Sequence, residues 1–204
     1  MKYPCTGVIL AGGQNSRFSG RNKALLEIGG TRILDRICDV FADLFEEIII
    51  VSNDPFSCAD RDLLIVTDIF PVRSSLTGIH TGLFSAARDK VFFTACDAPF
   101  LKKELVQTVL DHMDDRFDVT VPETAAGFEP LCAVYSKTCL DAVSRHLSRG
   151  EYKIRLLFRR LRVRTVGEKV LREKDPDLLS FFNVNTPEDL EKALRLADAG
   201  SGYG

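Results

Sequence analysis

The sequence lacks features that would place it in several large classes of protein. No apolar stretch approaches the length of a membrane span, and the apolar run before the first glycines is too short for a signal peptide. The 27 lysines and arginines do not outnumber the 29 aspartates and glutamates, so nothing suggests a nucleic-acid binder. We find no internal repeat, low-complexity segment or linker among the 204 residues.

The six cysteines contain no CxxC pair, which argues against a zinc site or a dithiol redox motif. We therefore expect reduced thiols and a cytoplasmic protein. Hydrophobic residues make up 45% of the chain and charged residues 27%, a balance typical of globular proteins. The length predicts a single domain over residues 1–200, and the small, glycine-rich end predicts a flexible tail at 201–204.

Apolar runs of strand length alternate with amphipathic stretches, the order typical of a mostly parallel sheet flanked by helices. Runs rich in β-branched and aromatic residues predict strands at 6–10, 47–53, 63–68, 91–97, 118–122, 129–135, 161–166 and 181–185. Apolar residues at helical spacing predict helices at 31–45, 101–112 and 137–147, and Thr186 with Pro187 marks the start of a last helix. The expected fold is a three-layer α/β fold with a Rossmann-like sheet.

In such a sheet, ligands bind beyond the carboxyl ends of the strands. Asn53, Asp68 and Asp97 each end an expected strand, and two glycines come shortly after another strand that ends at Leu10. Aspartate and asparagine favour loops for local reasons, so each residue alone says little. Their shared position in the topology predicts a site at this edge of the sheet.

The stretch from 7 to 30, GVILAGGQNSRFSGRNKALLEIGG, places two glycines directly after a buried strand. Glycines let the backbone approach a ligand, and exposed N–H groups in such a loop can surround phosphate oxygens. The side chains of Arg17 and Lys23 would add a planar fork and a point charge able to share a triphosphate. The alternative is a glycine turn with solvated basic residues.

Two familiar phosphate loops do not fit this stretch. A Walker A loop needs a lysine directly after glycine and a hydroxyl residue next, whereas Arg21 and Asn22 separate Gly20 from Lys23, and Ala24 follows. The glycine spacing also fails the GxGxxG pattern of dinucleotide folds.

The form LAGG-QNSRFSGRN-KALLEIGG resembles the amino-terminal signature of the nucleotide-sugar-transferase-like nucleotidyltransferases. Within them the chain is most similar to the molybdenum cofactor guanylyltransferases. Further segments match in order and rough spacing: VSND, VTD, SLTGI in place of a PLAGI-type loop, TACDAPF, EPLCAVY and FFNVNTPEDL. Three departures, at Ser19, Asn22 and Ser74-Ser75, affect the expected loop geometry more than the chemistry.

The resemblance implies a nucleotide-diphospho-sugar transferase type of fold and transfer of GMP from GTP to the phosphate of molybdopterin, with release of pyrophosphate. It implies GTP and molybdopterin as substrates, no nucleic acid or membrane partner, and allows for transient protein partners in cofactor delivery. The nucleotide would contact Leu10, Ala11, Gly12 and Gly13, with Lys23 and Arg17 at the phosphates and Asn53 and Asp68 at the nucleoside. The resemblance places Asn183 and Asn185 near the pterin substrate or the reacting phosphates.

The implied reaction needs no general base, because the attacking phosphate is already anionic near neutral pH. Catalysis must come from positioning and charge neutralisation, for which a divalent cation such as Mg²⁺ is the usual solution. Asp97 is the expected metal ligand, since a carboxylate after a strongly apolar strand is costly unless it is paired or coordinated. Its alternative role is to cap the helix expected after Pro99.

Two other functions stay open at this point. One is a cytidylyltransferase or another nucleotidyltransferase acting on a phosphorylated acceptor. The other is a nucleotide-binding assembly subunit that has lost catalysis, which the departures at Ser19, Asn22 and Ser74 would suggest, although Lys23 and Asp97 are intact.

Overall fold

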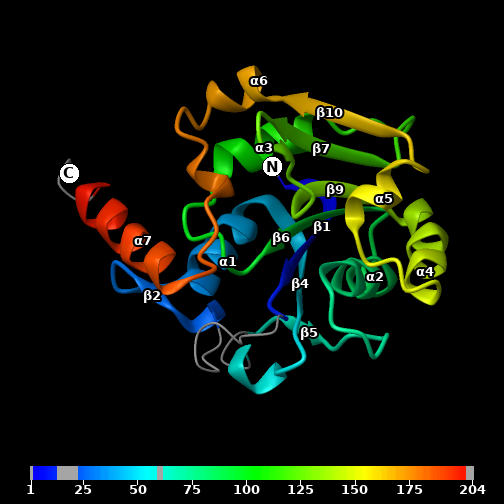
Figure 1. The fold of residues 1–204 in the computed structure, drawn as a ribbon, viewed down its shortest axis with the longest axis horizontal. Coiled ribbons are helices and arrows are strands. Elements are labelled where there is room, and N and C mark those ends of the chain that lie inside the picture. The colour runs from blue at the N-terminus through cyan, green and yellow to red at the C-terminus, as the bar shows by residue number, and fades with distance from the viewer. Residues whose placement is uncertain (1, 13–22, 59–61, 201–204) are drawn as a thin grey trace.

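The computed structural model describes residues 2–12, 23–58 and 62–200, which build one large sheet covered by helices (Figure 1). The strand order is β10-β7-β9-β6-β1-β4-β5, and β8 pairs with β7. The strands are β1 (Tyr3–Leu10), β4 (Phe45–Val51), β5 (Leu64–Val66), β6 (Lys90–Ala95), β7 (Val119–Thr124), β8 (Gly127–Phe128), β9 (Cys132–Ser136) and β10 (Val163–Gly167).

Most pairings in this sheet are parallel. Strand β1 lies between β4 and β6 and runs parallel to both, β5 continues parallel beside β4, and β10 is parallel to β7. Strand β9 runs against both of its neighbours, β6 and β7. The mostly parallel sheet expected from the apolar runs is confirmed.

Helices cover both faces of the sheet, which confirms the three layers. One face carries α1 (Ile33–Leu44), α3 (Lys103–Asp111), α6 (Glu168–Arg172) and α7 (Pro187–Gly200); the other carries α2 (Ser75–Ser85), α4 (Leu140–Ser148) and α5 (Ile154–Phe158). Successive residues of the central strands point to opposite layers, so Ile9 belongs to the first core while Val8 and Leu10 belong to the second.

The helix expected at 31–45 begins two residues later, because a small hairpin precedes it. Strands β2 (Glu27–Ile28) and β3 (Thr31–Arg32) pair antiparallel across Gly29 and Gly30. Both glycines have positive φ, 59° and 74°, as the tight hairpin turn requires. Four short 3₁₀ helices complete the described elements: η2 (Lys23–Leu25), η3 (Pro55–Cys58), η4 (Lys137–Cys139) and η5 (Leu179–Phe181).

The prediction of a strand at 181–185 was wrong. Residues 179–181 form η5, entered through Leu178 in a left-handed conformation (φ 53°), and residues 182–185 have no regular secondary structure. A single backbone hydrogen bond, from Val184 N to Asp97 O at 2.8 Å, ties this segment to the loop after β6. Its aromatic residues pack instead of pairing: Phe182 lies 5.9 Å from Phe100 between ring centroids. We call residues 173–186 the strap.

Two further boundaries differ from expectation. The SLTGI segment at 75–79 is the start of helix α2 and not a loop, because the Ser74 hydroxyl accepts a hydrogen bond from Thr77 N at 3.1 Å and caps the helix. Residues 129–131 precede β9 without joining it. The cap of the last helix is confirmed, since Asp189 N donates to the Thr186 hydroxyl at 3.2 Å.

All six cysteines are free and buried, as expected for reduced thiols. In the described ranges no helix has both the length and the apolar character needed to cross a membrane. The tail expected at 201–204 lies outside the described residues.

Gly7 in β1 provides a test of the core packing. A Cβ at this position would lie 2.5 Å from Phe45 Cδ2 and 2.7 Å from Phe41 Cδ2, and both rings are fully buried. We expect Gly7→Ala to lower the free energy of unfolding by about 1–3 kcal/mol, measured by chemical denaturation. Gly167→Ala is the control, because no atom lies within 4 Å of its Cβ position, and equal stability of the two variants would contradict the expectation.

Candidate functional site

The carboxyl ends of three central strands meet in register at one edge of the sheet. Leu10, the last residue of β1, pairs with Val51 of β4 and with Ala95 of β6. The chain continues the pairing for one more step, since Ala11 N donates to Val51 O at 2.8 Å and Cys96 N donates to Leu10 O at 3.1 Å. The expected gathering of strand ends at this edge is therefore confirmed.

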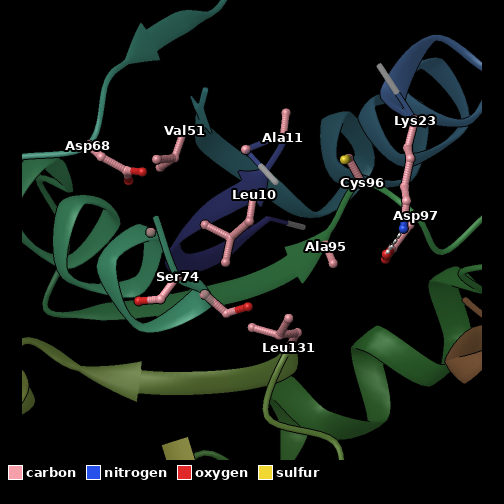
Figure 2. A pocket seen from close by; sticks show the side chains of 13 residues that line it. Leu10, Ala11, Lys23, Val51, Asp68, Ser74, Ala95, Cys96, Asp97 and Leu131 are labelled. Atoms are coloured by element: carbon pink, nitrogen blue, oxygen red, sulfur yellow. Dashed lines mark ion pairs between the residues drawn. The ribbon is translucent and has the colours of Figure 1, made fainter. Parts of the chain in front are cut away.

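A cavity of about 220 Å³ lies above these strand ends, and we call it the first cavity (Figure 2). In Figure 2, Asp68 lies at one side, Lys23 and Asp97 at the other, and Leu10 and Ala11 between them. It is lined by Leu10, Ala11, Gly12, Lys23, Val51, Asp68, Ser74, Ser75, Gly78, Ala95, Cys96, Asp97 and Leu131.

Lys23, Asp97 and Asn185 converge from three distant parts of the chain. Lys23 Nζ donates a hydrogen bond to Asn185 Oδ1 at 2.7 Å and lies 3.7 Å from Asp97 Oδ2. The side chains of Lys23 and Asp97 retain only 17% and 20% exposure. The structure therefore brings together three of the residues expected at the site.

Asp97 follows β6 by two residues and does not cap a helix, because α3 begins later, at Lys103. Burial raises the pKa of its carboxyl group above the usual value, while the Lys23 ammonium and a backbone hydrogen bond act in the opposite direction. Desolvation is thus only partly offset by this chain's own groups. Additional positive charge beside Asp97 would stabilise its ionised form.

Asp68 and Asn53 follow neighbouring strands and contact each other. Asn53 Nδ2 donates to Asp68 Oδ2 at 2.6 Å, and Asp68 N donates to Asn53 Oδ1 at 3.3 Å. The other carboxylate oxygen, Oδ1, is buried without a hydrogen bond of ordinary geometry. Burial raises the pKa of Asp68, opposed by Asn53, Arg73 and Thr81. Asn53 thus orients Asp68, and Asp68 is the residue of the pair that lines the first cavity.

The amino-terminal end of α2 forms one wall of the first cavity through Ser74 and Ser75. Unpaired N–H groups give the start of a helix a partial positive charge, which favours anions. Gly78 lets this helix approach the strand ends, because a Cβ there would lie 3.0 Å from Leu10 Cδ2.

A second cavity, of about 270 Å³, adjoins the first. The two share four lining residues: Ser75, Ala95, Asp97 and Leu131. Asn183 and Asn185 both line the second cavity, although they lie on the strap and not on the strand that was expected to give them a common face. Asp97 therefore stands where two cavities meet.

A third cavity, of about 370 Å³, continues from the second and shares Glu129 and Phe181 with it. The sequence reasoning gave neither residue a role. Glu129 opens the EPLCAVY segment, which matches the resemblance and was expected to be a strand, but no role was attached to its residues. That match does not distinguish a cavity-lining residue from a solvated loop residue.

Two expected nucleotide-contacting residues, Gly13 and Arg17, lie outside the described residues, as do Ser19 and Asn22. Gly12 lines the first cavity. A Cβ at Gly12 would lie 3.6 Å from Asn53 Nδ2, an ordinary contact, so crowding at the described neighbours does not by itself require glycine there.

The described residues contain no cluster of three or more His, Cys, Asp or Glu side chains able to hold a metal ion alone. A single carboxylate at a phosphate site nevertheless suits Mg²⁺, which is usually held by one or two carboxylates together with substrate phosphates and water. Asp97 meets this requirement.

Comparison with known proteins agrees with this architecture. Residues 7–166 match the model of the MobA-like NTP transferase domain. A molybdenum cofactor guanylyltransferase from Desulfosudis oleivorans is 46% identical over 195 residues, covering 96% of each chain. A probable molybdenum cofactor guanylyltransferase from Natranaerobius thermophilus is 36% identical, covering 93% of this chain and 95% of its own length.

Solved structures of nucleotide-transferring proteins have a similar fold. Molybdopterin-guanine dinucleotide biosynthesis protein A from Archaeoglobus fulgidus superimposes with a TM-score of 0.81 at 26% identity, over 95% of this chain and 99% of that one. A CMP:2-keto-3-deoxy-manno-octonic acid synthetase, at 16% identity and a TM-score of 0.74, shares the fold over 98% of this chain and all of its own.

Proposed function

This chain belongs to the MobA-like NTP transferase family, and from that membership we propose that it transfers the guanylyl group of GTP to the terminal phosphate of molybdopterin, releasing pyrophosphate. The first cavity would hold GTP and the second the acceptor. The observation that carries this assignment is the junction of the two cavities at Asp97, with Lys23 hydrogen-bonded to Asn185 across it.

The reaction forms a bond between an acceptor phosphate oxygen and the α-phosphorus of GTP, and breaks the bond from that phosphorus to the leaving pyrophosphate. Two anions must approach each other, so positive charge at the junction lowers the barrier. Lys23 supplies one such charge, and the start of α2 adds partial positive charge from the opposite wall. The two cavities hold the reactants close together, which reduces the entropic cost of their meeting.

Asp97 would hold a divalent cation, which we propose to be Mg²⁺. When bound, such a cation supplies positive charge at the phosphates and helps to orient them. Lys23, 3.7 Å from the same carboxylate, favours the ionised form of Asp97 against the effect of burial on its pKa.

Asp68 would read the guanine base. A carboxylate can accept hydrogen bonds from both the ring N–H and the exocyclic amine of guanine, a pair of donors that cytosine and adenine do not present together. Asn53, which donates to Oδ2, holds the carboxylate at the wall of the first cavity, and each carboxylate oxygen can accept more than one hydrogen bond.

Calorimetric titration with GTP, CTP and ATP in the presence of Mg²⁺ tests this assignment. We expect GTP to bind about tenfold more tightly than the other two or better, because the wrong base leaves Asp68 without its donors. Asp68→Asn should reduce this preference, whereas Asp62→Asn, an exposed carboxylate nearby in sequence, should keep it. Preference for CTP in the wild type would contradict the guanine assignment and favour a cytidylyltransferase.

We retain the cytoplasm as the proposed compartment, since six buried free cysteines suit a reducing environment. Transient protein partners in cofactor delivery belong to the same proposal.

A further inference from the structure

The half-buried side chain of Glu129 is the acidic group of the second cavity that the reaction leaves unused. It lines both the second and the third cavity, three residues before the start of β9. No hydrogen bond or ion pair to its carboxylate occurs within the described part of the chain, although its backbone is fixed at both ends. Its N–H donates to Pro122 O at 3.0 Å, and its carbonyl accepts from Cys132 N at 3.0 Å.

Partial burial leaves the Glu129 carboxylate short of compensating hydrogen bonds, so an ionised form at this position calls for a donor partner. Burial raises its pKa, and the positive charge of Arg155 opposes this effect. Arg155 lies over the adjoining hairpin turn, where a Cβ on Gly127 would come within 2.9 Å of its Nη2. When ionised, the carboxylate of Glu129 accepts hydrogen bonds and donates none.

The same region has an apolar lining. Phe181 lines the second and third cavities together with Glu129, and Leu178, Leu179 and Phe182 extend the apolar lining of the third. An aromatic ring system can stack on such side chains. Where the second cavity meets the third, it therefore combines an aromatic side chain with a pair of acceptor oxygens.

The edge of a pterin ring carries a ring N–H next to an exocyclic 2-amino group, two parallel donors that match the two oxygens of a carboxylate. We propose that Glu129 is the residue that recognises the pterin of the acceptor, accepting from these two donors while Phe181 contacts the ring face. This inference rests on the proposed function, because it assigns the second cavity to the acceptor. The phosphate of the acceptor would then lie at Asp97, where the second cavity meets the first, and its ring end at Glu129, where the second meets the third.

The test compares two fluorescent probes, 6-hydroxymethylpterin phosphate and the matching lumazine, in which oxygen replaces the 2-amino group. The chain has no tryptophan, so probe fluorescence can be followed with little protein background. We expect the wild type to bind the pterin roughly tenfold to a hundredfold more tightly than the lumazine. In Glu129→Gln the ratio should fall towards one, with the affinity for GTP unchanged.

Glu123→Gln is the matched control, since Glu123 is an exposed carboxylate on β7 of the same hairpin and should keep the wild-type ratio. A general loss of folding would weaken both probes and GTP alike, whereas loss of recognition changes the ratio. A wild-type ratio in Glu129→Gln, or no discrimination by the wild type, would overturn the inference.

A parallel assay separates this inference from the function on which it rests. Wild-type protein is incubated with GTP, Mg²⁺ and molybdopterin, and the guanine dinucleotide product is measured. If product forms but Glu129→Gln discriminates like the wild type, only the assignment of Glu129 fails. If the wild type forms no product, the proposed function fails and this inference with it.

Discussion

We expect Asp97→Asn to abolish guanylyl transfer while the protein stays folded. The carboxylate stands at the junction of the two cavities, 3.7 Å from the Lys23 ammonium, and is the proposed ligand of the divalent cation. An amide there carries no charge and binds Mg²⁺ weakly, so the reacting phosphates lose several kcal/mol of electrostatic stabilisation. We expect the rate of dinucleotide formation to fall by about a thousandfold or more.

The stability of this variant separates catalysis from folding. Burial holds the pKa of Asp97 above its unfolded value, so the folded chain binds more protons than the unfolded chain between the two pKa values. The contribution of Asp97 to stability therefore falls as the pH rises through this interval. Asparagine does not titrate, and we expect Asp97→Asn to unfold at pH 7 at a temperature no lower than that of the wild type.

Asp89→Asn is the control, because Asp89 is exposed at the opposite end of β6 and should leave transfer unchanged. Undiminished transfer in Asp97→Asn would refute the metal role. A large loss of thermal stability would mean that Asp97 serves the fold and not the reaction.

Lys23→Ala should weaken the binding of GTP by about tenfold to a hundredfold, because it removes a charge-assisted contact to the phosphates. GMP, with a single phosphate, should be affected less than GTP, and the preference for GTP over CTP should persist, since Asp68 reads the base. Calorimetric titration of the wild type and of Lys23→Ala, each with GTP and with GMP, measures the loss of affinity for the two nucleotides.

Lys103→Ala provides the comparison, since Lys103 pairs with Asp43 on the surface at 2.7 Å and retains 40% exposure. If the affinity of Lys23→Ala for GTP equals that of the wild type, the lysine serves only to hold Asn185 and Asp97. An equal loss for GTP and GMP would place Lys23 at the α-phosphate or the nucleoside, which the two nucleotides share, and not at the β- and γ-phosphates.

The central strands and the positions of Leu10, Asp68 and Asp97 could be predicted from the sequence because local patterns determine them. Apolar β-branched runs indicate strands buried on both faces, and the first polar residue after each run marks the edge where ligands gather. The same patterns predict Lys23 and Asp97 at one site, and the structure places Lys23 Nζ 3.7 Å from Asp97 Oδ2.

The strap could not be predicted in the same way. FFNVN has the composition of a strand, but a strand also needs a neighbour to pair with, and its packing partner Phe100 lies about eighty residues earlier. The residues on it still face the site, since the bond from Val184 to Asp97 holds the segment there. The role proposed for Glu129 was missed because its significance depends on cavities shared with Phe181, a contact between distant parts of the chain.

The reversed direction of β9 has a consequence for how the substrate pocket can change during evolution. Cys132 at its start pairs with Thr94 near the end of β6, so the chain enters β9 at the edge where the parallel strands finish. Residues that precede a strand, among them Glu129, therefore join residues that follow strands in one pocket. With the proposed assignment of the second cavity to the acceptor, insertions or replacements upstream of β9 would change acceptor selectivity while the loops around the first cavity and their supporting strands keep their places.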